Sequence, residues 1–420
     1  MKKITAILLI AISLPASIVF GEGKGTVYSR YGVGELSSFM SGRSLGMGYT
    51  GLAILSDGTI NRENPAALSR LAHVRFEADF QYTGYGMNDG VNSSYLSTGN
   101  FQSIMLAMPV YKKYGIVLAG GITPFSSVAY AVKSQETYQS VSATRSVVGS
   151  GGLTNAQVAT SVTPTDDLSL GLTLHYLFGT IHHKQTLTFT SSDYFTSESD
   201  RQLSASGFAS TVGIVYSGID KALSLSTEKK LNAAVTFFTG SSLSLTQSVL
   251  QNYATVTDTV VEKKSGTMEI PLTVGIGLAY LLQDRTILAV DGAFGNWSQY
   301  KELDVHPPEI RNNMRLGVGL DFLSSRGIPE SYWDQLSYRI GLGVNSSYLK
   351  INNQAINEYY VTGGFSFPLS TAGGESRINI AAEYGVRGTT SFNLEKDSIL
   401  RLTFSFTANE LSWFVQPEIE

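Results

Sequence analysis

The sequence predicts an all-β fold, a transmembrane antiparallel β-barrel of about 14 strands. Three observations predict it. The chain opens on a secretory signal and has no later apolar stretch of roughly 18 residues that could form a spanning helix. From residue 73 onward, apolar and polar residues alternate with a period of two. The alternating runs are joined by connections that are short and long in turn, as in bacterial outer-membrane barrels.

The N-terminus has the parts of a secretory signal peptide. Lys2 and Lys3 supply the positive charge, an apolar stretch follows, and a plausible cleavage site precedes Glu22. Pro15 interrupts the apolar stretch, so we expect cleavage rather than an uncleaved helical anchor. Residues 1–21 are therefore expected to direct the chain out of the cytoplasm of a Gram-negative bacterium.

The alternation gives each expected strand one apolar and one polar face. In the run from 74 to 83, even positions are apolar and odd positions are Arg, Glu, Asp, Gln and Thr. A soluble sandwich alternates in the same way, but the export signal and strands of about 9–11 residues favour the membrane. The expected strands cover 73–86, 99–110, 113–125, 152–163, 167–190, 202–217, 230–248, 267–282, 285–301, 309–322, 334–350, 355–368, 375–389 and 397–408.

The expected connections differ in length. Those at 111–112, 164–166 and 283–284 are tight, whereas those around 87–98, 126–151, 191–201 and 249–266 are long and rich in Ser, Thr, Asn and Tyr. Outer-membrane barrels have short periplasmic turns and long extracellular loops. The order of short and long connections therefore predicts a multi-pass barrel with its N-terminus in the periplasm.

The composition excludes several classes of protein. Charged residues make up only 15% of the chain and the net charge of −4 is spread along it, so nothing indicates nucleic-acid binding. A mean hydropathy of +0.04 is too low for a helical membrane protein and suits alternating strands. Because the chain has no Cys, disulfides, thiolate metal sites and a lipoprotein anchor are excluded.

Residues 22–72 differ from the rest, being rich in Gly, Ser and Asn without clear alternation. They carry a motif whose residues are Gly46, Gly48, Gly51, Asp57, Asn64, Pro65 and Ala66. This motif resembles the opening of the FadL-like family of outer-membrane transporters for long-chain fatty acids and other hydrophobic compounds. That family has a Gly-rich stretch, an Asp and an Asn-Pro-Ala tripeptide before its first barrel strand. The start of the segment at 28–34 departs from the family pattern, as does the continuation of the chain past the last strand.

The resemblance implies a barrel of 14 strands with the N-terminal segment inside the lumen as a hatch. It also implies a third strand that is kinked inward and opens a lateral passage to the membrane. Gly120, Gly121 and Pro124 lie in the expected third strand, where Pro and Gly mark bends; the alternative is that this strand ends at Pro124. The expected division is a signal peptide at 1–21, a hatch at 22–72, a barrel at 73–408 and a short C-terminal periplasmic tail at 409–420.

The sequence offers no set of residues for catalysis, a metal ion or a cofactor. His182 and His183 are adjacent in a strand and point to opposite faces, so they cannot easily share one metal. Nothing near His175 completes a hydrolase triad, and no Gly-rich phosphate loop opens a helix. We therefore expect a protein that is not an enzyme.

Polar residues on the inner faces are expected to line the lumen. The candidates are Arg75, Glu77, Asp79, His175, Arg315, Asp321, Arg339, Glu383, Arg387 and Arg401. Polar lumens are the norm in such barrels, so we expect these residues to hold the hatch by ion pairs and hydrogen bonds. The alternative is that one Arg binds the carboxylate head of a fatty acid in bidentate fashion.

Two functions follow as hypotheses. The first is passive outer-membrane transport of hydrophobic molecules such as long-chain fatty acids, with membrane lipids and a hydrophobic ligand as partners. The second is a non-transporting barrel subunit of an outer-membrane assembly or secretion complex, with other outer-membrane proteins as partners. An apolar pocket in the lumen would favour the first hypothesis.

Overall fold

The computed structural model describes residues 25–37, 41–138, 141–191, 193–224, 230–253, 256–282, 285–324, 331–371 and 374–410. It confirms the all-β fold and the transmembrane barrel of 14 antiparallel strands. The expected signal peptide and most of the expected tail, residues 411–420, lie outside the described residues. No helix in the described part of the chain is long and apolar enough to cross a membrane.

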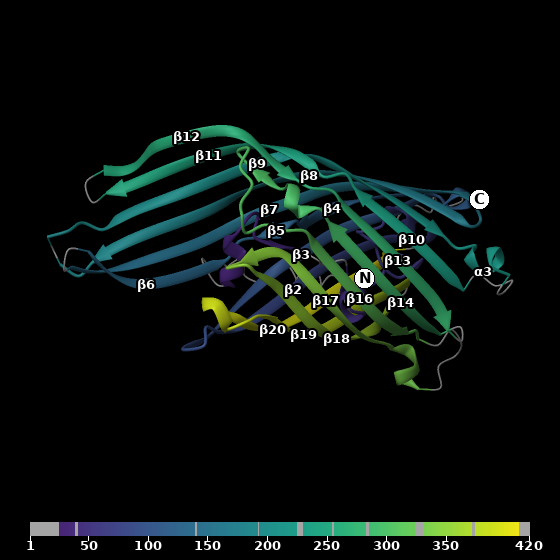
Figure 1. The fold of residues 1–420 in the computed structure, drawn as a ribbon. Coiled ribbons are helices and arrows are strands. Elements are labelled where there is room, and N and C mark those ends of the chain that lie inside the picture. Colours follow the sequence, from purple (N-terminus) through teal and green to yellow (C-terminus); the bar gives the residue numbers. More distant parts are fainter. Residues whose placement is uncertain are drawn as a thin grey trace.

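The wall consists of strands that each pair with their neighbours in the chain (Figure 1). At several places around the wall, two consecutive strand segments together form one bent strand of the barrel. In order around the wall, the strands are β2 (Val74–Asn88), β3 (Ser93–Tyr111), β4 (Ile116–Pro124) with β6 (Tyr130–Tyr138), β7 (Val141–Thr165), β8 (Leu168–Phe189), β9 (Ser197–Tyr216), β10 (Leu231–Phe238) with β11 (Ser241–Tyr253), β12 (Val256–Ile270) with β13 (Thr273–Leu282), β14 (Thr286–Gly295) with β15 (Lys301–Glu302), β16 (Asn313–Phe322), β17 (Ser337–Ile351), β18 (Gln354–Thr371), β19 (Gly374–Gly388) and β20 (Lys396–Glu410). The barrel closes because β2 pairs with β20 along its whole length.

The remaining elements are short. The N-terminal segment contains η1 (Val27–Arg30), β1 (Glu35–Leu36), α2 (Gly42–Gly46) and η2 (Pro65–Arg70), and the bend of the third strand contains β5 (Ser126–Ser127). The connections contain η3 (Lys112–Tyr114), α3 (Ile219–Ala222), η4 (Trp297–Gln299), η5 (Tyr332–Gln335) and η6 (Ser391–Asn393).

The alternation along the strands separates a lipid face from a lumen face. On β16, Met314, Leu316 and Val318 are exposed on the outside, whereas Asp321 on the opposite face is fully buried. On β2, Phe76 is exposed while the polar residues of the other face are buried. They are buried because the N-terminal segment occupies the lumen and covers them. The hatch is therefore part of the fold rather than an appendage.

The expected long loops are wrong in one respect, because most of their residues extend the strands. The segments at 87–98, 126–151 and 249–266 are largely covered by β2, β3, β6, β7, β11 and β12, and β9 covers 191–201 from Ser197 onward. Ser, Thr and Tyr with β-branched neighbours favour strands, and strands outside the membrane need no apolar face. Figure 1 shows the result on its left side, where β6 to β9, β11 and β12 reach well past the rest of the wall.

Candidate functional site

The Asn-Pro-Ala motif fastens the hatch to two wall strands. Asn64 caps η2: its Oδ1 accepts from the amide of Ala66 at 3.0 Å, and its Nδ2 donates to the carbonyl of Leu52 at 2.7 Å. Gly171 of β8 and Gly213 of β9 are register partners facing the motif. A Cβ on Gly171 would lie 2.3 Å from the motif backbone, and one on Gly213 would lie 2.1 Å from Asn64 Oδ1. The motif therefore needs both glycines opposite it.

A second glycine patch receives the Gly-rich part of the motif. Gly48 has a φ of +69°, a conformation that residues with a Cβ rarely adopt, and its amide donates to Thr362 Oγ1 at 2.9 Å. The patch opposite consists of two register pairs on β16 and β17, Gly317 with Gly343 and Gly319 with Gly341. A Cβ on Gly341 would lie 2.2 Å from the nitrogen of Gly48. The hatch backbone at Met47 and Gly48 touches the wall at Gly317, Gly319 and Gly341, whereas a Cβ on Gly343 would meet Tyr360 of the wall.

The other two motif glycines also meet the wall. Gly46 lies against Gly364 of β18. The amides of Gly51 and Leu52 donate to one carboxylate oxygen of Asp291 at 2.6 and 2.8 Å. Asp291 is buried on β14, so these bonds replace the water that its carboxylate would otherwise bind.

Ion pairs join the hatch to the first strand. The carboxylate of Asp57 accepts from the amide of Ala72 at 2.8 Å and lies 3.6 Å from the guanidinium of Arg75. Arg62 lies 3.1 Å from Asp79 and 3.7 Å from Glu77. The structure thus brings together three of the expected lumen residues, each with a partner in the hatch.

Similar pairs join the hatch to the middle of the wall. Asp321 of β16 lies between Arg43 of the hatch, at 2.7 Å, and Arg339 of β17, at 3.1 Å. Arg315 lies 2.9 Å from Glu63 of the hatch. Each expected arginine at this level therefore has a carboxylate partner.

A third set of ion pairs, which we name the outer charge cluster, joins the hatch to the last strands. Its members are Glu35, Glu358, Glu383, Arg387, Asp397 and Arg401. Glu35 of β1 lies 2.9 Å from Arg387 and 3.1 Å from Arg401. Arg387 also lies 2.8 Å from Asp397, and Arg401 lies 2.6 Å from Glu358 and contacts Glu383. Four carboxylates share two guanidinium groups, so the cluster has an excess of negative charge.

The pKa shifts of Glu35 and Tyr49 in the hatch favour the charged carboxylate and the neutral hydroxyl that these contacts need. Burial alone would raise the pKa of Glu35, but the adjacent guanidinium groups of Arg387 and Arg401 outweigh burial and lower the pKa to about 2. Burial, reinforced by the charge of Glu383, raises the pKa of Tyr49 well above its usual value. Tyr49 therefore stays a neutral donor, and its hydroxyl donates to Glu383 at 2.5 Å.

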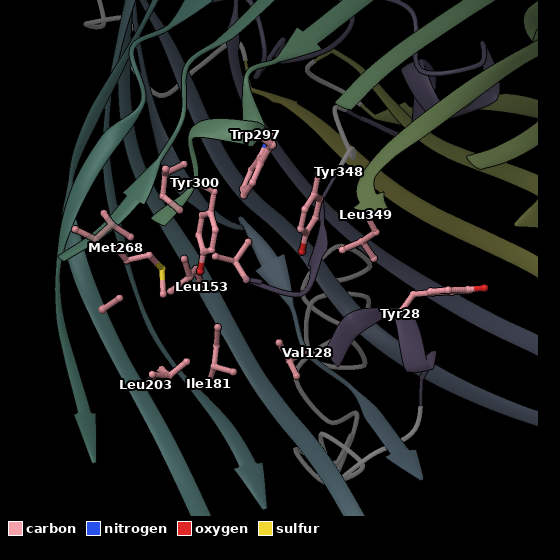
Figure 2. Packing of buried hydrophobic residues seen from close by; sticks show 14 of the residues in the cluster. Tyr28, Val128, Leu153, Ile181, Leu203, Met268, Trp297, Tyr300, Tyr348 and Leu349 are labelled. Atoms are coloured by element: carbon pink, nitrogen blue, oxygen red, sulfur yellow. The ribbon is translucent and has the colours of Figure 1, made fainter. Parts of the chain in front are cut away.

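Apolar side chains fill much of the lumen beyond the hatch (Figure 2). The connection between β14 and β16 folds inward and buries Trp297 and Tyr300. The ring of Trp297 stacks on those of Tyr348 and Tyr300, with centroids 4.7 and 5.8 Å apart. Leu203, Met268 and their neighbours pack in the same cluster.

An open cavity of about 600 Å³ lies between the hatch, the outer charge cluster and the third strand. Its wall contains Glu35, Arg387 and Arg401, many hydroxyl and amide groups, and apolar side chains of the lumen cluster such as Leu153 and Leu349. We name it the lumen cavity.

The third strand is interrupted where Pro124 ends β4. The chain then forms β5, which pairs with β1 of the hatch through Glu35↔Ser127 and Leu36↔Ser126, and resumes as β6 on β7. On its other side, β4 pairs with β3 only from Ile104 to Tyr111. In the described chain, the rest of β3 and the facing edge of β6 share no pairing; we name this boundary the seam.

The two glycines of the third strand differ in their surroundings. A Cβ on Gly121 would lie 2.1 Å from the carbonyl of Ile104, whereas one on Gly120 would meet nothing closer than 3.4 Å. Gly121 therefore belongs to the close contact between β3 and β4 that precedes the interruption.

His175 is a buried polar residue of the lumen face. Its ring nitrogens lie 3.1 Å from Asn155 Oδ1 and 2.8 Å from Thr211 Oγ1. The described residues contain no group of three or more His, Cys, Asp or Glu side chains that could hold a metal ion.

Sequence reasoning missed the hatch members of these ion pairs. Glu35, Arg43, Arg62 and Glu63 are charged residues in a segment that is otherwise rich in Gly, Ser and Asn. Isolated charges in such a segment could have indicated ion pairs with the charged residues on the inner face of the wall. Asp291 was also missed, although it is an acid in a strand flanked by Val290 and Gly292.

Comparison with known proteins supports the fold. A FadL homologue from Pseudomonas aeruginosa is 11% identical, with a TM-score of 0.60 over 90% of this chain and 99% of that chain. The toluene transporter TodX of Pseudomonas putida is 15% identical, with a TM-score of 0.59 over 90% and 99%. The toluene transporter TbuX of Ralstonia pickettii is 12% identical, with a TM-score of 0.56 over 88% and 97%. The resemblance to FadL-like proteins is thus one of fold.

No curated protein matches the chain. One family model, described as BamG, matches residues 1–420, the whole chain. The chain therefore belongs to the BamG family.

Proposed function

We propose that this protein is a non-transporting barrel subunit of a complex that assembles or secretes outer-membrane proteins. One observation carries the proposal: ion pairs fasten the hatch inside the lumen to the wall at three levels. The family name is consistent with an assembly-related function. We further propose that the short turns face the periplasm of a Gram-negative cell.

The ion pairs make displacement of the hatch costly. Removing one partner from a buried ion pair typically costs about 3–5 kcal/mol, because the other charge stays buried without compensation. Withdrawing the hatch would separate Arg43 from Asp321, Arg62 from Asp79 and Glu35 from Arg387. A permanent fastening of this kind suits a scaffold better than a route for molecules.

The one-sided extension of the wall offers a surface for a partner. Beyond the exposed aromatic residues Tyr176 and Phe178, the outer face of β8 carries His182, Lys184 and other polar groups. Ten residues of strand span about 33 Å. A polar surface of this height outside the bilayer fits a protein partner better than lipid.

The first experiment is a tagged native purification in mild detergent, followed by mass spectrometry. We expect a stoichiometric set of other outer-membrane proteins. A barrel that purifies alone under several mild detergents would contradict the proposal.

A charge swap on the extension sharpens the experiment. Lys184 lies 2.8 Å from Glu198 of the neighbouring strand. Lys184→Glu breaks this pair, whereas the double variant Lys184→Glu with Glu198→Lys restores it with the charges exchanged. If a partner contacts this surface, both variants lose the partner while the barrel stays folded. If the pair acts only within the barrel, the double variant recovers the partner.

The second candidate is passive transport of hydrophobic molecules such as long-chain fatty acids. The seam at the third strand favours it, since an unpaired boundary in the wall is a route between lumen and membrane. The lumen charges argue against a fatty-acid head group, because the arginines already have carboxylate partners and the outer charge cluster has excess negative charge.

Uptake assays separate the two candidates. Transport predicts that a deletion strain takes up labelled oleate or toluene more slowly, and that re-expression restores the rate. Unchanged uptake of both compounds in the deletion strain would remove the second candidate and leave the first intact.

A further inference from the structure

The lumen cavity is a feature that the proposed function leaves unused. At about 600 Å³, it falls within the range of about 300–1,000 Å³ that is typical of small-molecule sites. It reaches from the hatch to Phe101 and Pro124 at the seam. The cavity therefore has both the size and the access of a binding site.

The charged groups of the cavity already have partners. Arg387 and Arg401 bind the carboxylates of the outer charge cluster, and Arg315 binds Glu63. An anionic ligand would face an excess of carboxylates. The cavity thus disfavours anionic ligands.

The uncharged part of the wall is rich in hydrogen-bonding groups. Asn100 and Gln102 of β3 and Asn345 of β17 present amides, each with donors and acceptors. The rings of Tyr28 and Tyr348 form part of the same wall. Amides match hydroxyl groups, and aromatic rings pack against C–H surfaces. Gln102 already donates to Gln81 and Asn100 already accepts from Thr98, but each amide has further donors and acceptors, which a purely apolar ligand would leave without partners.

We propose that the lumen cavity binds a neutral, hydroxyl-rich small molecule of the size of a di- or trisaccharide. The amides of Asn100, Gln102 and Asn345 bind the hydroxyl groups, and the rings of Tyr28 and Tyr348 pack against the C–H faces. This site is independent of the proposed assembly function and differs in chemistry from a site for fatty acids.

The test uses the full chain purified in detergent and isothermal titration with maltose, lactose and maltotriose, with laurate titrated separately. We expect at least one saccharide to bind with a Kd of about 1 mM or tighter. We expect laurate neither to bind in the cavity nor to displace a bound saccharide. If no saccharide binds, the cavity holds water only and the proposal is overturned.

Variants locate the binding. Asn345→Trp fills the cavity, Asn345→Leu removes the amide at similar size, and Ala382→Trp on the lipid face is the matched control. We expect Asn345→Trp to weaken saccharide binding by about tenfold or more, Asn345→Leu to weaken it less, and Ala382→Trp to leave it unchanged. If Asn345→Trp does not fold, as seen in its heat-dependent gel mobility, Asn345→Leu decides. Saccharide binding unchanged in the folded variants, or laurate binding lost in them, would overturn the proposal.

Discussion

Replacing Gly341 by Ala should release the hatch. The new Cβ would lie 2.2 Å from the nitrogen of Gly48, about 1.3 Å short of van der Waals separation. Overpacking of this kind costs about 1–3 kcal/mol, and loss of the bond from Gly48 to Thr362 adds about 1 kcal/mol. A total of about 2–4 kcal/mol raises the population of the displaced hatch about 30- to 700-fold.

The assay uses the absence of Cys in the natural chain. The single reporter is Ala53→Cys, at a hatch residue that is fully buried against the wall, so a maleimide reaches it only when the hatch moves. We expect its labelling rate to rise by the factor above in Gly341→Ala. The control is Gly363→Ala on the adjacent strand, where a Cβ would meet nothing closer than 3.7 Å. Labelling of Gly341→Ala as slow as that of the control, in a folded barrel, would refute the reasoning.

Three further predictions concern other contacts of the hatch. The pKa of Glu35 is about 2 in the folded protein and about 4.3 in the unfolded chain. Its stabilising contribution is therefore complete above pH about 4.3 and is lost as the pH falls through about 2. Across this window the unfolding temperature should drop in the natural protein but less in Glu35→Gln, and an equal drop in both proteins would contradict the prediction. Arg401→Ala should cost about 3–5 kcal/mol, because buried carboxylates lose their partner, whereas exposed Lys396→Ala should be neutral; heat-dependent gel mobility measures both. Asn64→Ala should cost about 1–2 kcal/mol through the lost cap and speed proteolysis of the hatch, while Asn92→Ala in an exposed hairpin should not.

The wall was predictable because its signal is local. Alternation with a period of two assigns each residue of a strand to a face, so residues 74–83 alone reveal the lipid face and the lumen face. The long extensions of the strands were not predictable from the sequence, because they lack an apolar face and resemble loops rich in Ser and Thr.

The fastening of the hatch was predictable only in part. The inner-face charges such as Arg401 were found from the phase of the strands, but their partners, such as Glu35, lie more than 300 residues away in the chain. No local pattern reports a contact over that separation. The glycines at 317, 319 and 341 carried a signal in their polar phase, but only the structure identifies the hatch backbone that touches them.

The distance between these partners has a consequence for how the molecule forms. Glu35 emerges from the ribosome early, whereas Arg401, its partner at 3.1 Å, comes near the end, on the strand that closes the barrel with β2. Contacts of such high sequence separation form slowly, because loop-closure entropy is lost before they stabilise the chain. The hatch therefore cannot form these ion pairs while the sheet is still open. It forms them when the last strand pairs with the first and the barrel closes around it. Maturation should be governed by this final closure rather than by the hairpins that precede it.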